Sequence, residues 1–246
     1  IKTGKIFSLV EELKYKPICI NGQKILPKDI VNNGLEINTP QKQEIISFVK
    51  NWLSESEYIE VKTSGSTGPP KVIPLKKQSF IESALQTIDF FKLQENECAL
   101  LCLPVKFIAG KMLLMRGWVA GLNLVSVEPT LNPLEKINET VFIDFAAMTP
   151  MQVSATLAGN NGKEKISLIK NLIIGGAPIN TILENKLQSL NTQCYATYGM
   201  TETLSHVALK KLNGESKSNS FKALKGINFS IDSRSCLCIN APNLAD

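Results

Sequence analysis

The middle of the chain alternates short apolar stretches with amphipathic ones, and this alternation limits the possible folds more than any other feature. The apolar stretches have the length of buried strands and lie at Cys98–Leu103, Leu122–Val127, Phe142–Met148, Leu172–Ile174 and Gln193–Thr197. The amphipathic stretches among them predict helices at Lys111–Ala120, Pro150–Ala158 and Asn180–Leu190. Strands that alternate with helices pair in parallel, so the sequence predicts an α/β fold with mainly parallel sheets flanked by helices. In such sheets, ligands bind outside the carboxyl ends of the strands.

Local signals predict further elements on either side of this core. Thr39 followed by Pro40 is typical of a helix N-cap with proline at the first helical position, and opens a helix to about Leu53. Ser79 and Glu82 form a capping-box pattern, which predicts that another helix begins there. Further strands are expected at Tyr58–Lys62, His206–Lys210, Asn228–Ile231 and Leu237–Ile239, with a polar loop at Leu212–Ser220.

Composition limits the class of protein. The 246 residues fit one large α/β domain or two modest ones, and the net charge of +5 is scattered, which favours solubility and mild attraction to anions over nucleic-acid binding. Six cysteines form no Cys-x-x-Cys pair and most lie in apolar runs, where they are expected to be small buried hydrophobes. With a single histidine, these features disfavour a zinc site and indicate a reducing, cytoplasmic location. We expect neither a signal peptide nor a membrane span.

A run of small, polar and Gly-rich residues follows the expected strand Tyr58–Lys62. Its hydroxyls, its backbone amides and a final lysine are groups that cradle phosphate oxygens, whereas a plain surface turn is the alternative that composition alone favours. The spacing differs from the Walker pattern, in which lysine comes directly after glycine. The residues assigned to phosphate binding are Thr63, Ser64, Gly65, Ser66, Thr67, Gly68 and Lys71.

The string Thr-Ser-Gly-Ser-Thr-Gly-x-Pro-Lys resembles the signature loop of the adenylate-forming superfamily, which includes acyl-CoA synthetases, luciferases and peptide-synthetase adenylation domains. Two further motifs follow in the family's order. A glycine-rich turn after a strand would contact adenine, and a Tyr-Gly-x-Thr-Glu motif would stack on adenine, donate to the α-phosphate and hold Mg²⁺ through Glu202. The residues that carry these two matches are Gly175, Gly176, Ala177, Pro178, Tyr198, Gly199, Met200, Thr201 and Glu202.

The resemblance covers roughly Tyr58 to Val207 and implies a chemistry. ATP and a carboxylic acid would form an acyl-AMP, and CoA would then accept the acyl group, with Lys71, Thr201 and Glu202 as catalytic residues and Mg²⁺ as the metal. The family's later motifs are not found, so residues 1–246 are expected to be its large N-terminal AMP-binding domain, truncated before the C-terminal domain. The chain could also form a homo-oligomer.

A fourth, looser motif match concerns the binding site of the carboxylic acid substrate. Leu-Pro-x-x-His-x-x-Gly of the family corresponds to Leu103–Gly110, where Phe107 replaces histidine and could gate the acyl pocket sterically or be ordinary core. Arg116 lies six residues after Gly110 and could pair with a second substrate carboxylate, or extend its guanidinium to the surface. Together with Lys111 and Ser205 as further candidate anchors, this layout resembles the o-succinylbenzoate–CoA ligases of menaquinone biosynthesis.

The sequence also fits two other functions. The chain could belong to another acid–CoA ligase or to a peptide-synthetase adenylation domain, or it could be an inactive relative that binds ATP. The single histidine, His206, could suggest catalysis, but the alternating run Ser205–Leu209 favours a strand position for it.

Overall fold

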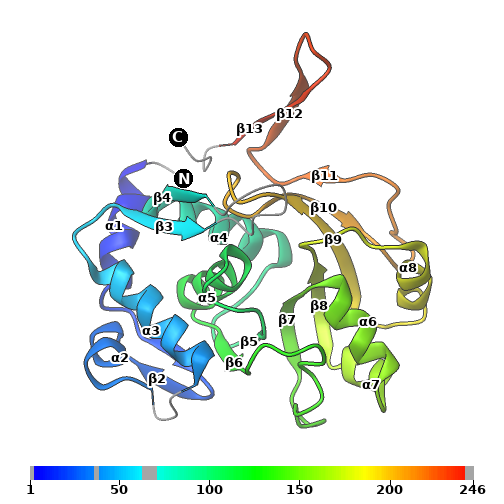
Figure 1. The fold of residues 1–246 in the computed structure, drawn as a ribbon, viewed down its shortest axis with the longest axis horizontal. Helices are drawn as coiled ribbons and strands as arrows, with labels where there is room; N and C mark the ends of the chain where they lie inside the picture. Colours follow the sequence, from blue (N-terminus) through cyan, green and yellow to red (C-terminus); the bar gives the residue numbers. More distant parts are fainter. Residues whose placement is uncertain (1–2, 36–38, 63–70, 242–246) are drawn as a thin grey trace.

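The computed structural model describes residues 3–35, 39–62 and 71–241, and the side chains from Ser8 onward. A nine-stranded sheet forms its centre, and its strands are β1 (Ile18–Ile20), β2 (Gln23–Ile25), β5 (Cys98–Leu101), β6 (Asn123–Ser126), β7 (Ile143–Met148), β8 (Ile169–Ile174), β9 (Gln193–Gly199), β10 (His206–Lys211) and β11 (Lys222–Ala223). They lie in the order β11-β10-β9-β8-β7-β5-β6-β1-β2 (Figure 1). Each neighbouring pair from β9 across to β1 is parallel, and antiparallel pairs complete both edges. The predicted α/β fold with a mainly parallel sheet is confirmed.

Helices cover both faces of this sheet. They are α1 (Thr3–Leu13), α2 (Pro27–Asn33), α3 (Pro40–Leu53), α4 (Lys77–Phe91), α5 (Ile108–Ala120), α6 (Pro150–Ala158), α7 (Gly162–Ser167) and α8 (Thr181–Leu187). Two hairpins lie outside the sheet, β3 (Tyr58–Lys62) with β4 (Val72–Lys76), and β12 (Asn228–Ile231) with β13 (Leu237–Asn240).

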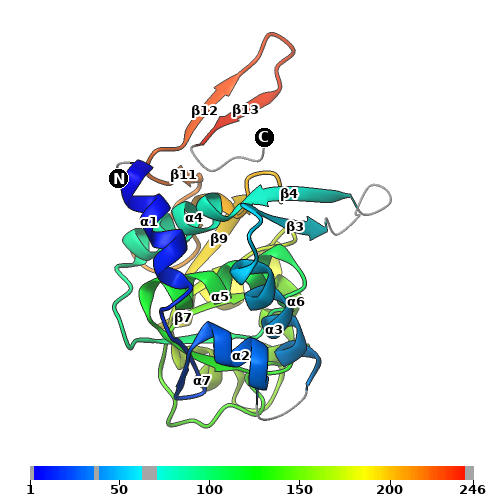
Figure 2. The same ribbon diagram turned by 90° about the vertical axis from the view of Figure 1, so that its left-hand side faces the viewer.

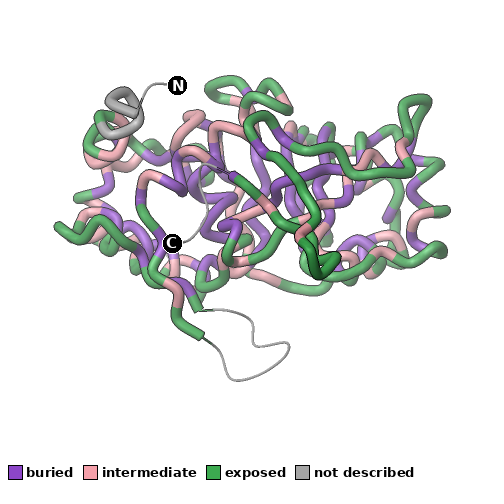
Figure 3. Tube along the Cα trace, turned by 90° about the horizontal axis from the view of Figure 1, so that it is seen from above, coloured by how far each residue is buried: buried purple, intermediate pink, exposed green. Residues whose placement is uncertain are grey.

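Side chains that alternate along each strand build two separate cores. In β7, Phe145 and Ala147 pack into a cluster with buried side chains of α3, α4 and α5. Ala146 and Met148 of the same strand face the opposite way, into a cluster with α6, α7 and α8. Successive residues of a strand point to opposite faces, so a strand buried on both faces is mostly apolar. β7 is apolar except for Asp144, which is only half-buried and whose carboxylate accepts the Cys98 N–H. Buried segments accordingly run through the interior of the molecule (Figure 3).

Helix starts were predicted correctly where the signal is local. Thr39 caps α3 by accepting the Lys42 N–H, and Thr149 forms a complete capping box with Gln152 at the start of α6. The capping box predicted at Ser79 and Glu82 is wrong. Helix α4 already begins at Lys77, because the buried Lys77 ammonium donates to the Ser54 carbonyl at 2.6 Å and holds the helix start against the preceding segment.

The segment before Thr39, for which no element was predicted, contributes α1, α2, the strand β1 and the edge strand β2 beside it. Two cysteines depart from the expected burial. Cys236 and Cys238 are exposed on the β12–β13 hairpin, whereas Cys102 and Cys194 are buried. That hairpin extends away from the main body, as two views at right angles show (Figures 1 and 2). Within the described residues, no helix is both long and apolar enough to cross a membrane.

Candidate functional site

The predicted motifs meet at one edge of the sheet. Strands β5, β7, β8 and β9 are neighbours and run parallel, so their carboxyl ends lie side by side. Leu103–Gly110 comes after β5, Thr149 after β7 and Gly175–Pro178 after β8, while Met200–Thr203 leaves the end of β9. This is the edge at which open parallel sheets bind their ligands.

The turn after β8 requires its first glycine. The Gly175 N–H donates to the Met148 carbonyl at 3.1 Å, and a Cβ on Gly175 would lie 2.0 Å from the Thr197 hydroxyl of β9. Gly176 has a φ of +83°, a conformation that side chains disfavour. Ala177 and Pro178 are exposed with it. The turn is therefore packed tightly on its sheet side and open on its outer side.

The Tyr-Gly-x-Thr-Glu motif is the reversal between β9 and β10. Tyr198 and Gly199 are the last residues of β9, not residues beyond it as expected. A Cβ on Gly199 would lie 2.2 Å from the Ser205 carbonyl, so glycine is needed for the two ends of the loop to approach. The Thr203 hydroxyl accepts the Met200 N–H at 2.9 Å and donates to the Ser205 carbonyl at 2.8 Å. The loop is thus closed by its own hydrogen bonds.

Within this loop, the two proposed catalytic residues differ in exposure. Thr201 is half-buried, and its carbonyl accepts the Leu204 N–H at 2.8 Å. Glu202 is exposed. Leu204 holds a φ of +64° although its side chain is fully buried, a strained conformation for a residue other than glycine. The loop is therefore held by the buried Leu204 side chain, two residues after the exposed Glu202.

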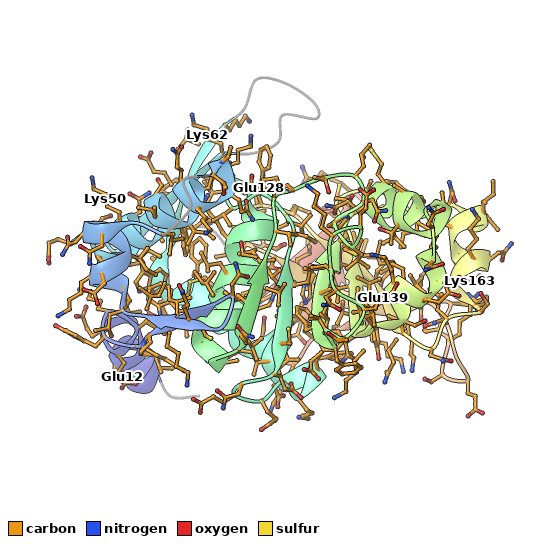
Figure 4. The ribbon with its side chains drawn as sticks, turned by 90° about the horizontal axis from the view of Figure 1, so that it is seen from below. Glu12, Lys50, Lys62, Glu128, Glu139 and Lys163 are labelled. Atoms are coloured by element: carbon orange, nitrogen blue, oxygen red, sulfur yellow. The ribbon has the colours of Figure 1, made fainter. Side chains whose placement is uncertain are left out.

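Arg116 is the most unusual residue at this edge. It lies on α5 and is 2% exposed, so the alternative that it reaches the surface is wrong. Its Nε donates to the Thr87 hydroxyl at 3.1 Å, and its Nη2 donates to the Ser205 hydroxyl at 2.6 Å. Two predicted acid-binding residues are therefore in direct contact, although they lie on different elements. Other charged side chains, such as Lys50, Lys62 and Lys163, lie at the periphery (Figure 4).

The Arg116 charge has no carboxylate partner among the residues that the structure describes, since no ion pair there includes it. Burial lowers the pKa of Arg116 to about 9, and it stays protonated at neutral pH. His206 lies beside it, with Nδ1 3.5 Å from Arg116 Nη2. Burial first, and the Arg116 charge second, lower the pKa of His206 well below 6.5. The site is an enclosed positive charge surrounded by neutral groups.

The other acid-site candidates have different surroundings. Lys111 is buried, and its ammonium donates to the Val105 and Lys106 carbonyls at 2.8 Å each, with burial lowering its pKa to about 8. Phe107 is 42% exposed, so it is not ordinary core. A Cβ on Gly110 would lie 2.2 Å from the Pro104 carbonyl, which shows that this glycine allows α5 to begin against the preceding turn.

The phosphate-loop residues Thr63 to Gly68 lie outside the described residues. Lys71 is described, is exposed and directly precedes β4.

The sequence analysis did not identify Thr87, which completes the surroundings of Arg116. Its signal was a hydroxyl on the apolar face of α4, seven residues after the buried Phe80. His206 occupies a strand position, as predicted, but its ring also contacts the Arg116 site.

No group of three or more metal-binding side chains occurs in the described part of the chain. Glu202 therefore offers a single carboxylate. One carboxylate together with substrate phosphates is a usual way for proteins to bind Mg²⁺, so the residue fits that ion.

Comparisons with known proteins agree with the motifs found in the sequence. Residues 56–226 match the family described as AMP-binding enzyme. Among curated relatives, the 2-succinylbenzoate–CoA ligase of Bacillus cytotoxicus is 26% identical over 174 residues, which covers 70% of this chain and 36% of the relative. The Escherichia coli K12 enzyme of the same name is 28% identical over 152 residues, 62% of this chain and 32% of the relative. The chain thus spans about a third of the length of these relatives.

Solved structures of adenylate-forming enzymes also resemble this chain. An acyl-CoA synthetase (AMP-forming)/AMP-acid ligase II-like protein from Dyadobacter fermentans is 36% identical, with a TM-score of 0.79 over 87% of this chain and 61% of that one. The O-succinylbenzoate coenzyme A synthetase of Bacillus subtilis, in complex with ATP and magnesium ion, is 21% identical, with a TM-score of 0.64 over 76% of this chain and 41% of that one. At 21% identity, the likeness to the Bacillus subtilis structure shows a shared fold.

Proposed function

Because this chain belongs to the AMP-binding enzyme family of adenylate-forming acid–CoA ligases, we propose that it provides the nucleotide and acid sites of an ATP-dependent ligase acting on o-succinylbenzoate. The carboxylate of the succinyl group would attack the α-phosphorus of ATP, and pyrophosphate would leave. The CoA thiol would then attack the acyl-AMP carbonyl, and AMP would leave. Such a step serves menaquinone biosynthesis.

The nucleotide side of the proposal uses the edge formed by β8 and β9. The open turn Gly175–Pro178 offers backbone to adenine, with Tyr198 beside it at the end of β9. Charge builds on the phosphoryl oxygens as the α-phosphorus is attacked, so fixed donors are what catalysis needs. Thr201 and Lys71 are assigned that role, together with Thr63–Gly68. Mg²⁺ held by Glu202 would supply charge neutralisation at the phosphates.

One observation supports the acid assignment above the others: the buried Arg116 guanidinium is hydrogen-bonded to neutral groups and lacks an anionic partner in the described residues. An isolated buried charge costs several kcal/mol of folding free energy, which a bound anion would offset. o-Succinylbenzoate carries a second, aromatic carboxylate besides the one to be activated. We assign Arg116 and Ser205 first to that second carboxylate. Lys111 ranks behind them, because two of its three N–H donors are engaged by the Val105 and Lys106 carbonyls.

Calorimetric titration with ATP, with and without Mg²⁺, tests the nucleotide site. In the wild type, Mg²⁺ should tighten ATP binding, and Glu202→Gln should lose roughly tenfold of that gain because the carboxylate charge is gone while its shape is kept. Glu215→Gln, the same change at another exposed glutamate in the loop after β10, is the matched control and should behave as wild type. An equal Mg²⁺ effect in Glu202→Gln would remove this residue from the metal site.

A further inference from the structure

Four side chains from three elements form a closed ring of hydrogen bonds around the Arg116 guanidinium. Thr87 comes from α4, Arg116 from α5, and Ser205 and His206 from the start of β10 and the loop before it. His206 Nε2 lies 3.2 Å from the Thr87 hydroxyl, and its Nδ1 lies 3.3 Å from the Ser205 hydroxyl. The ring thus runs from Arg116 through Ser205 and His206 to Thr87 and back to Arg116.

A neutral His206 completes this ring in either tautomer. The Thr87 oxygen accepts from Arg116 Nε, and the Ser205 oxygen accepts from Arg116 Nη2. With the proton on Nε2, the imidazole donates to Thr87 and accepts the Ser205 proton at Nδ1, while the Thr87 hydroxyl donates to the Ser83 carbonyl at 3.3 Å. With the proton on Nδ1, the imidazole donates to Ser205 and accepts the Thr87 proton at Nε2. In both tautomers every donor in the ring faces an acceptor.

A charged imidazolium is disfavoured by the charge beside it. With protons on both nitrogens, the positive His206 ring would lie with Nδ1 3.5 Å from the Arg116 Nη2 donor. Two positive charges would also share a buried site, since His206 is 6% and Arg116 2% exposed. The lowered pKa of His206 agrees with this geometry.

We propose that His206 is a positioning residue that, as a neutral hydrogen-bond relay between Ser205 and Thr87, fixes the Arg116 guanidinium for the second carboxylate of the substrate. This inference rests on the proposed function of Arg116. The ring uses Arg116 Nε and Nη2, and among the described residues Nη1 makes no hydrogen bond. That nitrogen is the donor left for a carboxylate. Because Ser205 and His206 end the loop that begins at Gly199, the same loop carries Glu202 and two of the side chains that surround Arg116.

The test uses two non-hydrolysable acyl-sulfamoyl-adenosines, one bearing the o-succinylbenzoyl group and one lacking its aromatic carboxylate. Calorimetry gives their Kd values for each variant. His206→Phe keeps ring volume and removes both hydrogen bonds, so it should weaken the dicarboxylate probe about tenfold and leave the monocarboxylate probe unchanged. His206→Asn keeps an amide close to the Nδ1 position, which accepts from or donates to Ser205, and should recover most of that loss.

A double-mutant cycle separates positioning from general structure. In an Arg116→Met background, His206→Phe should cause no further loss of dicarboxylate affinity, because the guanidinium that it orients is gone. Equal weakening of both probes by His206→Phe, or additive losses in the double variant, would overturn the inference. The proposed function itself fails if Arg116→Met alone leaves the dicarboxylate affinity unchanged. A loss in Arg116→Met without any loss in His206→Phe would contradict the positioning role and leave the anchor in place.

Discussion

At the scale of single residues, the acid site is a compromise between folding and binding. Arg116 is buried among hydroxyls and a neutral imidazole, an arrangement that removes a charge from water without pairing it with an anion in the described residues. Such a charge destabilises the native state relative to an apolar side chain of similar size. Its retention in the core is therefore understandable if a ligand carboxylate completes the site.

The same site gives the protein a pH-dependent stability of known sign. His206 is the chain's single histidine, and its pKa in the native state lies well below 6.5 because of burial and the Arg116 charge. As pH falls below 6.5, the unfolded chain binds a proton that the native state does not, so this part of the stability is lost between 6.5 and the native pKa, and it is fully present above 6.5.

Urea unfolding at pH 7.5 and pH 5.5 measures this effect. The wild type should lose about 1 kcal/mol more unfolding free energy between the two pH values than His206→Phe does. Carboxylates titrate in both proteins alike and cancel in the comparison. Identical losses in the two proteins would show that the native imidazole titrates normally and is not held neutral.

At the scale of elements, the reversal from β9 to β10 joins the nucleotide motif to Ser205 and His206, which contact Arg116. Its geometry depends on Gly199, where a Cβ would lie 2.2 Å from the Ser205 carbonyl and 2.6 Å from His206 Cα. Both contacts are with backbone, which cannot rotate away. Any side chain at this position must therefore displace the residues that hold Arg116.

Gly199→Ala should accordingly lower the unfolding free energy by about 1–3 kcal/mol, the usual cost of overpacking, and reduce discrimination between the two probes. Gly159→Ala is the matched control, because its φ is −80° and its closest contact would be the end of the Asn132 side chain at 3.0 Å. That variant should stay near wild-type stability in urea. If Gly199→Ala were as stable as Gly159→Ala, the close approach of the two loop ends would be refuted.

At the scale of the whole molecule, the sequence was sufficient for features with local causes. Apolar runs such as Phe142–Met148 give the sheet, and caps at Thr39 and Thr149 give helix starts, because a side chain and its own backbone decide them. Lys77 begins α4 ahead of Ser79 through a contact with Ser54, which is a tertiary effect.

The surroundings of Arg116 could not be predicted for the same reason. Thr87 and His206 are 119 residues apart, and no periodicity relates them. Motif resemblance predicted which residues lie at the carboxyl edge of the sheet, since β5, β7, β8 and β9 bring their ends together there. It also proposed Arg116 and Ser205 separately, but their hydrogen bond to each other, and the imidazole beside them, follow from packing alone.

The central claim is that this chain binds an acyl-adenylate whose acid has a second carboxylate held by Arg116. Calorimetry of the 246-residue protein with the dicarboxylate and monocarboxylate probes tests it most directly. Wild type should bind the dicarboxylate probe roughly ten- to a hundredfold more tightly, in line with about 1.5–3 kcal/mol for hydrogen bonds to a charged group. Arg116→Met should bind both probes equally and ATP as wild type does. Equal binding of the two probes by the wild type, or unaltered discrimination in Arg116→Met, would contradict the claim.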